Sequence, residues 1–493
     1  MLITARADAT GGISTPENPV APPDQGLLAR SSKFNLPLGL KSSRQEAGGV
    51  RSSAPPPRFQ SCEEKSSLTG TSMKTMVCVF ILAISGPVVA DASEAGSRSS
   101  AEVRIEAAQK VLQKQPNRYR AYNDLALALI RRARETGDNS YYQQAQVAIE
   151  SSLRIQPENF EGEQAHAALL LAEHRYRPAL EEAQALNHRM PDAVLIWGYM
   201  AEAEAALGDY KQAEESAQWM MNLRPGNLPA YLTGAALRQD WGDIDGALDF
   251  LSKALQQTPP LETEETTWIL TRMAQLHRQA GRAGAADALL DQALKTIPDY
   301  YLSLEELAEV RLAQHRCPEA VDLMEKRNRS FPSPSSYLLA ARALEHAGRA
   351  GEAATMYKEF EREARAQIAL PDNANVQLIL YYAEHAREPQ EALRIARMET
   401  ESRQDVWTLD AYAWALYANG QFAEAGQQIE KALAVGTCDA VLFYHAGEIE
   451  VASGKKVEAN RYFQQSLDIN PTSEVSEAAR RGAIQSGNLT AAR

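Results

Sequence analysis

Proline and alanine recur along this chain in steps of 34 residues. The first cycles place them at Pro157, Pro191, Pro225 and Pro259 and at Ala145, Ala179, Ala213 and Ala247. Two residue types in step over four cycles mark an internal repeat, which constrains the fold before any other feature is considered. After an insertion around residues 260–266 the alanines resume at Ala286, Ala320, Ala353, Ala392, Ala425 and Ala459. Together with the four alanines before the insertion, they mark about ten repeats.

Each repeated residue has a mechanical role. A glycine or histidine stands five residues before most of these alanines, as Gly208, Gly242 and His315 do. Glycine permits a tight turn between two helices, alanine lets their backbones approach closely, and proline ends the second helix. The repeat unit is therefore expected to be a pair of antiparallel helices, which must stack on its neighbours to bury an apolar face.

The turn segments resemble those of the tetratricopeptide repeat. The sequences at 207–213 (LGDYKQA) and 419–425 (NGQFAEA) carry the likeness, and it covers residues 118–472. It implies an all-α, right-handed superhelical solenoid of about ten helix-turn-helix repeats, whose first helices line a concave groove. Residues 91–117 are expected to form a linker and a first helix, and residues 473–493 a capping helix and tail.

Residues 73–90 have the form of a secretory signal peptide. Lys74 precedes an apolar run from Met76 to Ile84, and small residues lead to a cleavage position after Ala90. The preceding residues 1–72 are rich in Ser, Pro and Gly and are expected to be disordered or untranslated, with the true start at Met73. The mature chain is expected to be periplasmic or secreted and to lack a transmembrane anchor.

The charge is unevenly distributed. Residues 1–90 carry 9 Lys and Arg against 6 Asp and Glu, so a net charge of −13 for the whole chain leaves −16 on the remainder. An acidic body repels phosphate backbones, which argues against nucleic-acid binding. Cys317 and Cys438 are expected to be free, mostly buried thiols, because about three repeats separate them.

No catalytic, cofactor or metal motif is recognisable. The sequence has no phosphate-binding loop, dinucleotide glycine motif, zinc-protease motif or paired cysteine cluster, so no enzyme activity, cofactor or metal is expected. The eight histidines are expected at helix ends or on the surface, where an imidazole satisfies free carbonyls.

One helix is apolar on two sides. Between residues 407 and 417, a core stripe of Leu409, Tyr412, Ala413 and Leu416 lies beside a second stripe of Trp407, Asp410, Trp414 and Tyr417. The second stripe requires extra burial or a ligand. Neighbouring first helices add Tyr381, Glu384, His385, Tyr444 and Glu448, so these nine residues form the candidate partner-binding site. The alternative is that the rings pack against one another in a tight superhelix.

These features predict an exported scaffold that holds a peptide or partner protein in its concave groove. The alternative is a non-catalytic subunit of an envelope enzyme or export complex that positions a separate catalytic chain. The sequence leaves the partner, the pathway and the oligomeric state open.

Overall fold

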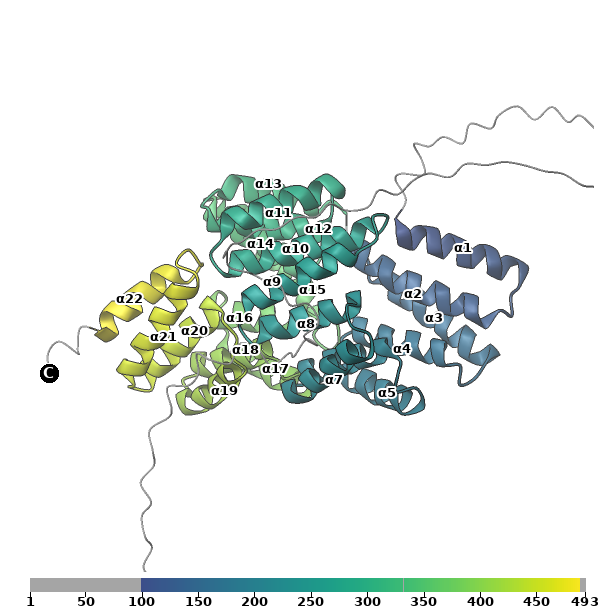
Figure 1. Cartoon of the computed structure of the whole chain (residues 1–493). Helices are drawn as coiled ribbons and strands as arrows, with labels where there is room; N and C mark the ends of the chain where they lie inside the picture. The colour runs from purple at the N-terminus through teal and green to yellow at the C-terminus, as the bar shows by residue number, and fades with distance from the viewer. Residues whose placement is uncertain (1–98, 331, 488–493) are drawn as a thin grey trace, which may run out of the picture. The chain divides into compact units, whose positions relative to one another are not determined.

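The computed structural model describes residues 99–330 and 332–487, and this part of the chain contains 22 α-helices and no β-strand (Figure 1). The expected signal segment 73–90 and residues 1–72 lie outside the described residues. No described helix combines the length and the apolar character needed to cross a bilayer.

Twenty of the helices form ten consecutive antiparallel pairs. The first five pairs are α2 (Tyr119–Thr136) with α3 (Ser140–Ile155), α4 (Phe160–Ala172) with α5 (Tyr176–Arg189), α6 (Val194–Ala206) with α7 (Tyr210–Leu223), α8 (Leu228–Asp240) with α9 (Ile244–Gln257), and α10 (Thr263–Gln279) with α11 (Ala283–Thr296). The last five are α12 (Tyr301–Ala313) with α13 (Cys317–Arg327), α14 (Pro334–His346) with α15 (Ala350–Ala366), α16 (Asn375–Glu384) with α17 (Pro389–Ser402), α18 (Val406–Ala418) with α19 (Phe422–Ala434), and α20 (Ala440–Ala452) with α21 (Lys456–Ile469). Helix α1 (Ser100–Lys114) packs on α2, and α22 (Ser476–Gly487) packs on α21. The superhelical solenoid expected from the repeat is thus confirmed.

The repeated alanines and turn residues do what the spacing predicts. All ten alanines are buried, with exposed fractions between 0% and 3%. The turn glycines adopt left-handed backbone, as at Gly208 with φ of 85°. Where histidine replaces the glycine, at His174 and His315, φ is 57° in both cases. Each turn therefore keeps its geometry even where a side chain must accept a left-handed conformation.

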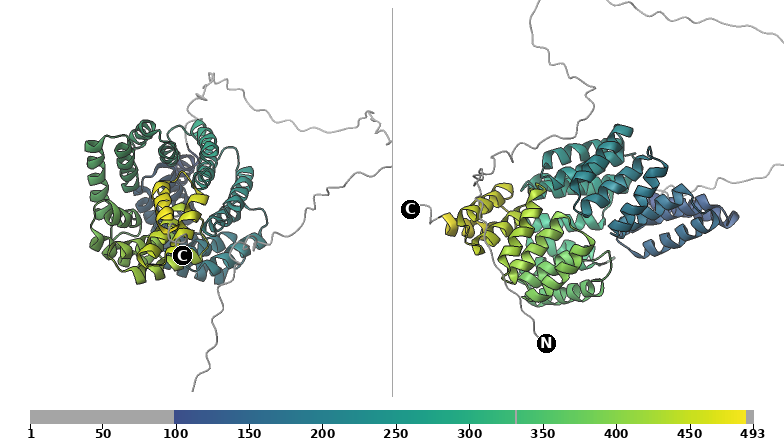
Figure 2. Two further views of the ribbon diagram at one scale, coloured as in Figure 1. Left: turned by 90° about the vertical axis from the view of Figure 1, so that its left-hand side faces the viewer. Right: turned by 90° about the horizontal axis from the view of Figure 1, so that it is seen from below.

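The first helices of the pairs lie on the inner side of the curve. Helix α16 contacts α18, α18 contacts α20, and the same holds for α2 with α4, α4 with α6, and α6 with α8. The second helices of neighbouring pairs lack comparable contacts among the described residues and spread apart. A stack whose first helices are close together and whose second helices diverge is concave on the first-helix side. Figure 2 shows the pairs following one another around this curve.

Loops six repeats apart meet in a seam. The Gln404 amide before α18 donates to the carbonyl of Ala206 at 2.9 Å, and the Thr437 hydroxyl before α20 donates to the carbonyl of Asp240. The Asn470 side chain before α22 donates to the carbonyl of Arg278 at 3.1 Å. These partners are 192 to 198 residues apart, so successive turns of the superhelix touch directly.

The insertion after Pro259 also makes long-range contacts. Arg131 on α2 pairs with Glu262 at 2.7 Å, and Arg134 pairs with Glu264 at 2.7 Å. The hydroxyl of Tyr300 donates to Glu264 at 2.9 Å. The extra residues therefore place carboxylates at the start of α10, where they hold the first repeat against the fifth.

The two cysteines of the described chain are more exposed than the sequence predicts. Cys317 and Cys438 are both free, but Cys438 is exposed and Cys317 is half-buried, so the expectation of buried thiols is wrong. The reason is that Cys438 lies in the loop before α20, at the seam, and not on a helix face.

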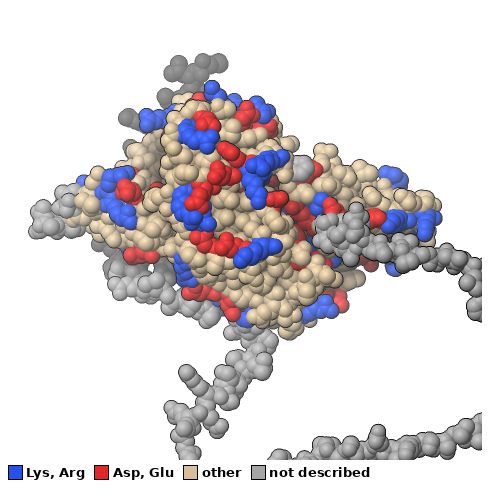
Figure 3. Space-filling model, turned by 90° about the horizontal axis from the view of Figure 1, so that it is seen from above, with Lys and Arg blue, Asp and Glu red and all other residues tan. Residues whose placement is uncertain are grey.

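On the face shown in Figure 3, basic and acidic side chains are interspersed and form no continuous basic stripe.

Candidate functional site

The nine predicted site residues come from three consecutive first helices. Tyr381 and Glu384 lie on α16 and His385 caps its end; Trp407, Asp410, Trp414 and Tyr417 lie on α18; Tyr444 and Glu448 lie on α20. Because α18 contacts both α16 and α20, the fold brings Glu384 together with the site residues of α20 and those of α18 other than Trp407. Tyr381 and His385 instead stack on Tyr357 of α15. Trp407 lies two helical turns, about 10 Å, before Trp414 on the same helix, at one end of the group.

A histidine that sequence reasoning did not select lies at the centre of this group. His445 on α20 is 1% exposed, and its Nδ1 lies 2.9 Å from Oδ1 of Asp410. Its Nε2 lies 3.7 Å from Oε1 of Glu384 on α16. The expectation that the histidines lie at helix ends or on the surface is therefore wrong for His445. Register alone would not have found this pair, because Asp410 and His445 are 35 residues apart, one more than the repeat step of 34.

The surroundings of His445 favour its charged form. Burial alone would lower the pKa of the imidazole, but the charges of Asp410 and Glu384 and their hydrogen bonds outweigh burial and raise this pKa to about 10. His445 is thus an imidazolium at neutral pH, and it links carboxylates from the two preceding first helices.

Trp414 is part of the packing beneath the surface. It is 7% exposed and lies between two rings, stacked on His445 at 4.0 Å and on Tyr417 at 4.6 Å between centroids. Asp410 is likewise buried against His445. The expectation that the whole second stripe of α18 points into the groove is therefore wrong for Asp410 and Trp414, because α20 covers them.

The remaining residues stay accessible. Glu384 and His385 are exposed, whereas Tyr381, Tyr417, Tyr444 and Glu448 are half-buried. We call these six residues the acidic-aromatic face. Tyr417 donates to Glu448 at 3.4 Å, and His385 stacks on Tyr357 of α15 at 4.0 Å. Trp407 is also half-buried, with its backbone amide held by Asp405 at 3.0 Å.

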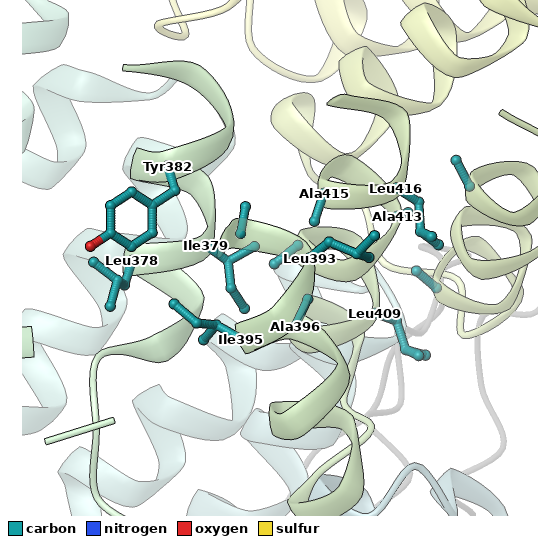
Figure 4. Close-up of a cluster of buried hydrophobic side chains, with 14 of the residues drawn as sticks. Leu378, Ile379, Tyr382, Leu393, Ile395, Ala396, Leu409, Ala413, Ala415 and Leu416 are labelled. Carbon is teal, nitrogen blue, oxygen red and sulfur yellow. The ribbon is translucent and has the colours of Figure 1, made fainter. Parts of the chain in front are cut away.

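The acidic-aromatic face rests on an apolar cluster that extends from α15 to α20. Figure 4 shows Leu378 and Ile379 of α16, Leu393 and Ile395 of α17, and Leu416 of α18 within this cluster. All five are 6% exposed or less. Close packing of this kind fixes the helices that carry the face, so its side chains are held on a rigid support.

Charge at the face is incompletely balanced. Among the described residues, no lysine or arginine lies within ion-pair distance of Glu384 or Glu448; the recorded ionic partner of Glu384 is His445. Burial raises the pKa of Glu448, although the hydrogen bond from Tyr417 and the charge of His445 act in the opposite direction. No set of three metal-ligating side chains suited to an ion is found in residues 99–330 and 332–487.

Comparisons with known proteins bear on the fold. No protein-family model matches the sequence, and no curated protein matches it. The helix pairs, the left-handed turns and the buried alanines of the chain itself show that it folds as a solenoid of helix-turn-helix repeats.

Several solved structures are similar to parts of the chain, with TM-scores below 0.5. The APC/C hetero-tetramer Cut9–Hcn1 is 14% identical with a TM-score of 0.38, over 76% of this chain and 56% of that one. The human IFIT1 dimer with PPP-AAAA is 16% identical with a TM-score of 0.42, over 74% of this chain and 87% of that one. A thermophilic TPR protein of Thermus thermophilus is 25% identical with a TM-score of 0.32, over 35% of this chain and 92% of that one.

Proposed function

We propose that the protein is a binding scaffold that holds a segment of a partner protein on its acidic-aromatic face. The observation that carries the proposal is the combination of accessible rings and carboxylates on α16, α18 and α20, with no lysine or arginine of the described chain paired to Glu384 or Glu448. Tyrosine rings supply large, rigid contact area and are enriched among binding anchors. These side chains are carried by consecutive first helices packed on a rigid apolar cluster, which supports a fixed binding surface.

Affinity capture from the source organism tests this function. The bait is the chain itself, compared with a Tyr417→Ala, Tyr444→Ala double variant. A Trp219→Ala variant serves as the control, because Trp219 is a 51% exposed ring on the second helix α7, outside the face. We expect a specific protein to be captured by the chain and by the control but lost from the double variant, with equal helicity by circular dichroism. Retention of the same proteins by all three baits would refute the proposal.

We further propose that this binding takes place after export, in the periplasm or outside the cell. The support is the sequence pattern of residues 73–90, with its basic start, apolar run and small-residue cleavage position. Intact mass spectrometry of the chain from the envelope and cytosolic fractions tests it. A mature chain beginning near Asp91 in the envelope fraction is expected, and an unprocessed chain confined to the cytosol would contradict export.

A further inference from the structure

We infer that the acidic-aromatic face recognises one arginine side chain of the partner segment, held between Glu384 and Glu448. The inference rests on the proposed function and names the chemistry of its partner. It follows from the position of each carboxylate beside His445, from the neighbouring aromatic rings and from the charge balance around His445.

The two carboxylates flank one point of the solenoid. Glu384 reaches from α16 to within 3.7 Å of His445, and Glu448 follows His445 by three residues on α20. Glu448 also accepts a hydrogen bond from the Tyr417 hydroxyl at 3.4 Å, so its carboxylate lies beside the aromatic rings of α18. Residues three and four apart on a helix have Cβ atoms about 5 to 6 Å apart. A single long side chain can therefore reach both carboxylates.

The neighbouring aromatic rings offer surfaces for a planar cation. Tyr417 stacks on Trp414 at 4.6 Å, and the Tyr444 ring is tilted relative to that of Trp414, with 6.1 Å between their centroids. A guanidinium group stacks on aromatic faces and donates to carboxylates in a fixed fork. An ammonium group forms ion pairs but lacks the planar shape, so arginine is favoured over lysine.

The charge balance calls for a cation from outside. Asp410, Glu384 and Glu448 carry three carboxylates, and the His445 imidazolium is the one cation recorded in direct contact with this set among the described residues. Arg481 on α22 is close enough to act on the pKa of Tyr444, but it has no recorded ion pair with either glutamate. His445 is buried and so cannot meet the partner; it holds Glu384 and Asp410 in place.

A peptide library tests the inference. The probe is an immobilised set of dodecapeptides, random except for a central arginine, lysine, citrulline or norleucine. Binding of the chain is compared with that of a Glu384→Gln, Glu448→Gln variant. A Glu424→Gln, Glu430→Gln variant is the control, because it removes the same charge from exposed positions on the second helix α19.

We expect peptides with a central arginine to bind about tenfold more tightly than their citrulline counterparts, which corresponds to about 1.4 kcal/mol. This preference should vanish in the Glu384→Gln, Glu448→Gln variant and persist in the control. Binding without an arginine preference, a preference that survives in the first variant, or no peptide binding at all overturns the inference. None of these results removes the proposed function, because native affinity capture with the tyrosine variants tests that separately.

Discussion

At the scale of single residues, His445 carries the strongest interaction at the site. The buried His445 imidazolium bridges Asp410 and Glu384. Removing one member of this ion pair leaves an uncompensated buried charge, which destabilises the folded protein. His445→Ala is expected to lower stability by about 3 kcal/mol or more. Thermal unfolding measures the loss. A double variant with Asp410→Ala should lose less than the two single variants together, and strict additivity would contradict the coupling.

The same residue predicts a pH dependence. The folded-state pKa of His445 is raised from its ordinary value of 6.5 to about 10, so its contribution to stability is complete below about pH 6.5 and declines as pH rises towards 10. The difference in unfolding temperature between the chain and His445→Ala should therefore shrink between pH 6.5 and 10. A difference that stays constant over this range would show that His445 is not charged in the folded protein.

At the scale of helices, the start of α20 is held by a side-chain cap. Asp439 accepts from the amides of Val441 at 2.8 Å and Leu442 at 3.1 Å, and α20 carries three residues around the site. Replacing such a cap by alanine costs about 1 kcal/mol. Asp439→Ala is expected to lower the unfolding temperature and weaken partner binding, whereas Asp439→Asn, which keeps the acceptor, should lie close to the unchanged chain. Equal losses in both variants would assign the effect to charge.

Much of this helical organisation could be predicted from sequence, because each repeat specifies its own turn and close contact. Ala425 and Gly420 occupy the positions that the register assigns to them. The three helices of the site could also be named, since they are consecutive first helices and each carries aromatic side chains. The burial of Trp414 and Asp410 could not be predicted from sequence. It depends on how closely α20 approaches α18 and on the contact that His445 makes with both side chains.

At the scale of the whole repeat array, the seam joins turns that no local pattern connects. Thr437 and Asn470 are polar loop residues whose partners lie 197 and 192 residues earlier, so neither has a signature in its own repeat. The contact between successive turns of the superhelix therefore cannot be predicted from the repeat pattern. The loops before α18 and α20, which lead into two of the three helices of the candidate site, are held by α6 and α8.

A glycine substitution at the seam tests this role. Gly242 has φ of 73°, and a Cβ there would lie 2.5 Å from the carbonyl oxygen of Gly436 and 2.6 Å from Sγ of Cys438. Gly420 has φ of 71° and nothing within 4 Å of the same position, so Gly420→Ala carries the backbone strain without the clash. Gly242→Ala is expected to be less stable than Gly420→Ala by about 1 to 3 kcal/mol.

Hydrogen–deuterium exchange reports where Gly242→Ala acts. Faster exchange is expected in residues 435–440 and, because the seam is continuous, in the Gln404 amide that donates to Ala206. The Gly420→Ala control should leave both segments protected. If the exchange rates of the seam amides are unchanged in Gly242→Ala, the seam contacts do not stabilise the two turns of the superhelix.

The central claim, that a partner segment lies on the acidic-aromatic face, is tested most directly by photo-crosslinking in the source organism. A benzophenone amino acid is placed at position 417 on α18, or at position 147 on α3, where Val147 is 62% exposed on the second-helix side. A specific covalent adduct from position 417 and none from position 147 is the predicted result. Adducts from position 147 alone, or the same adducts from both, would contradict it.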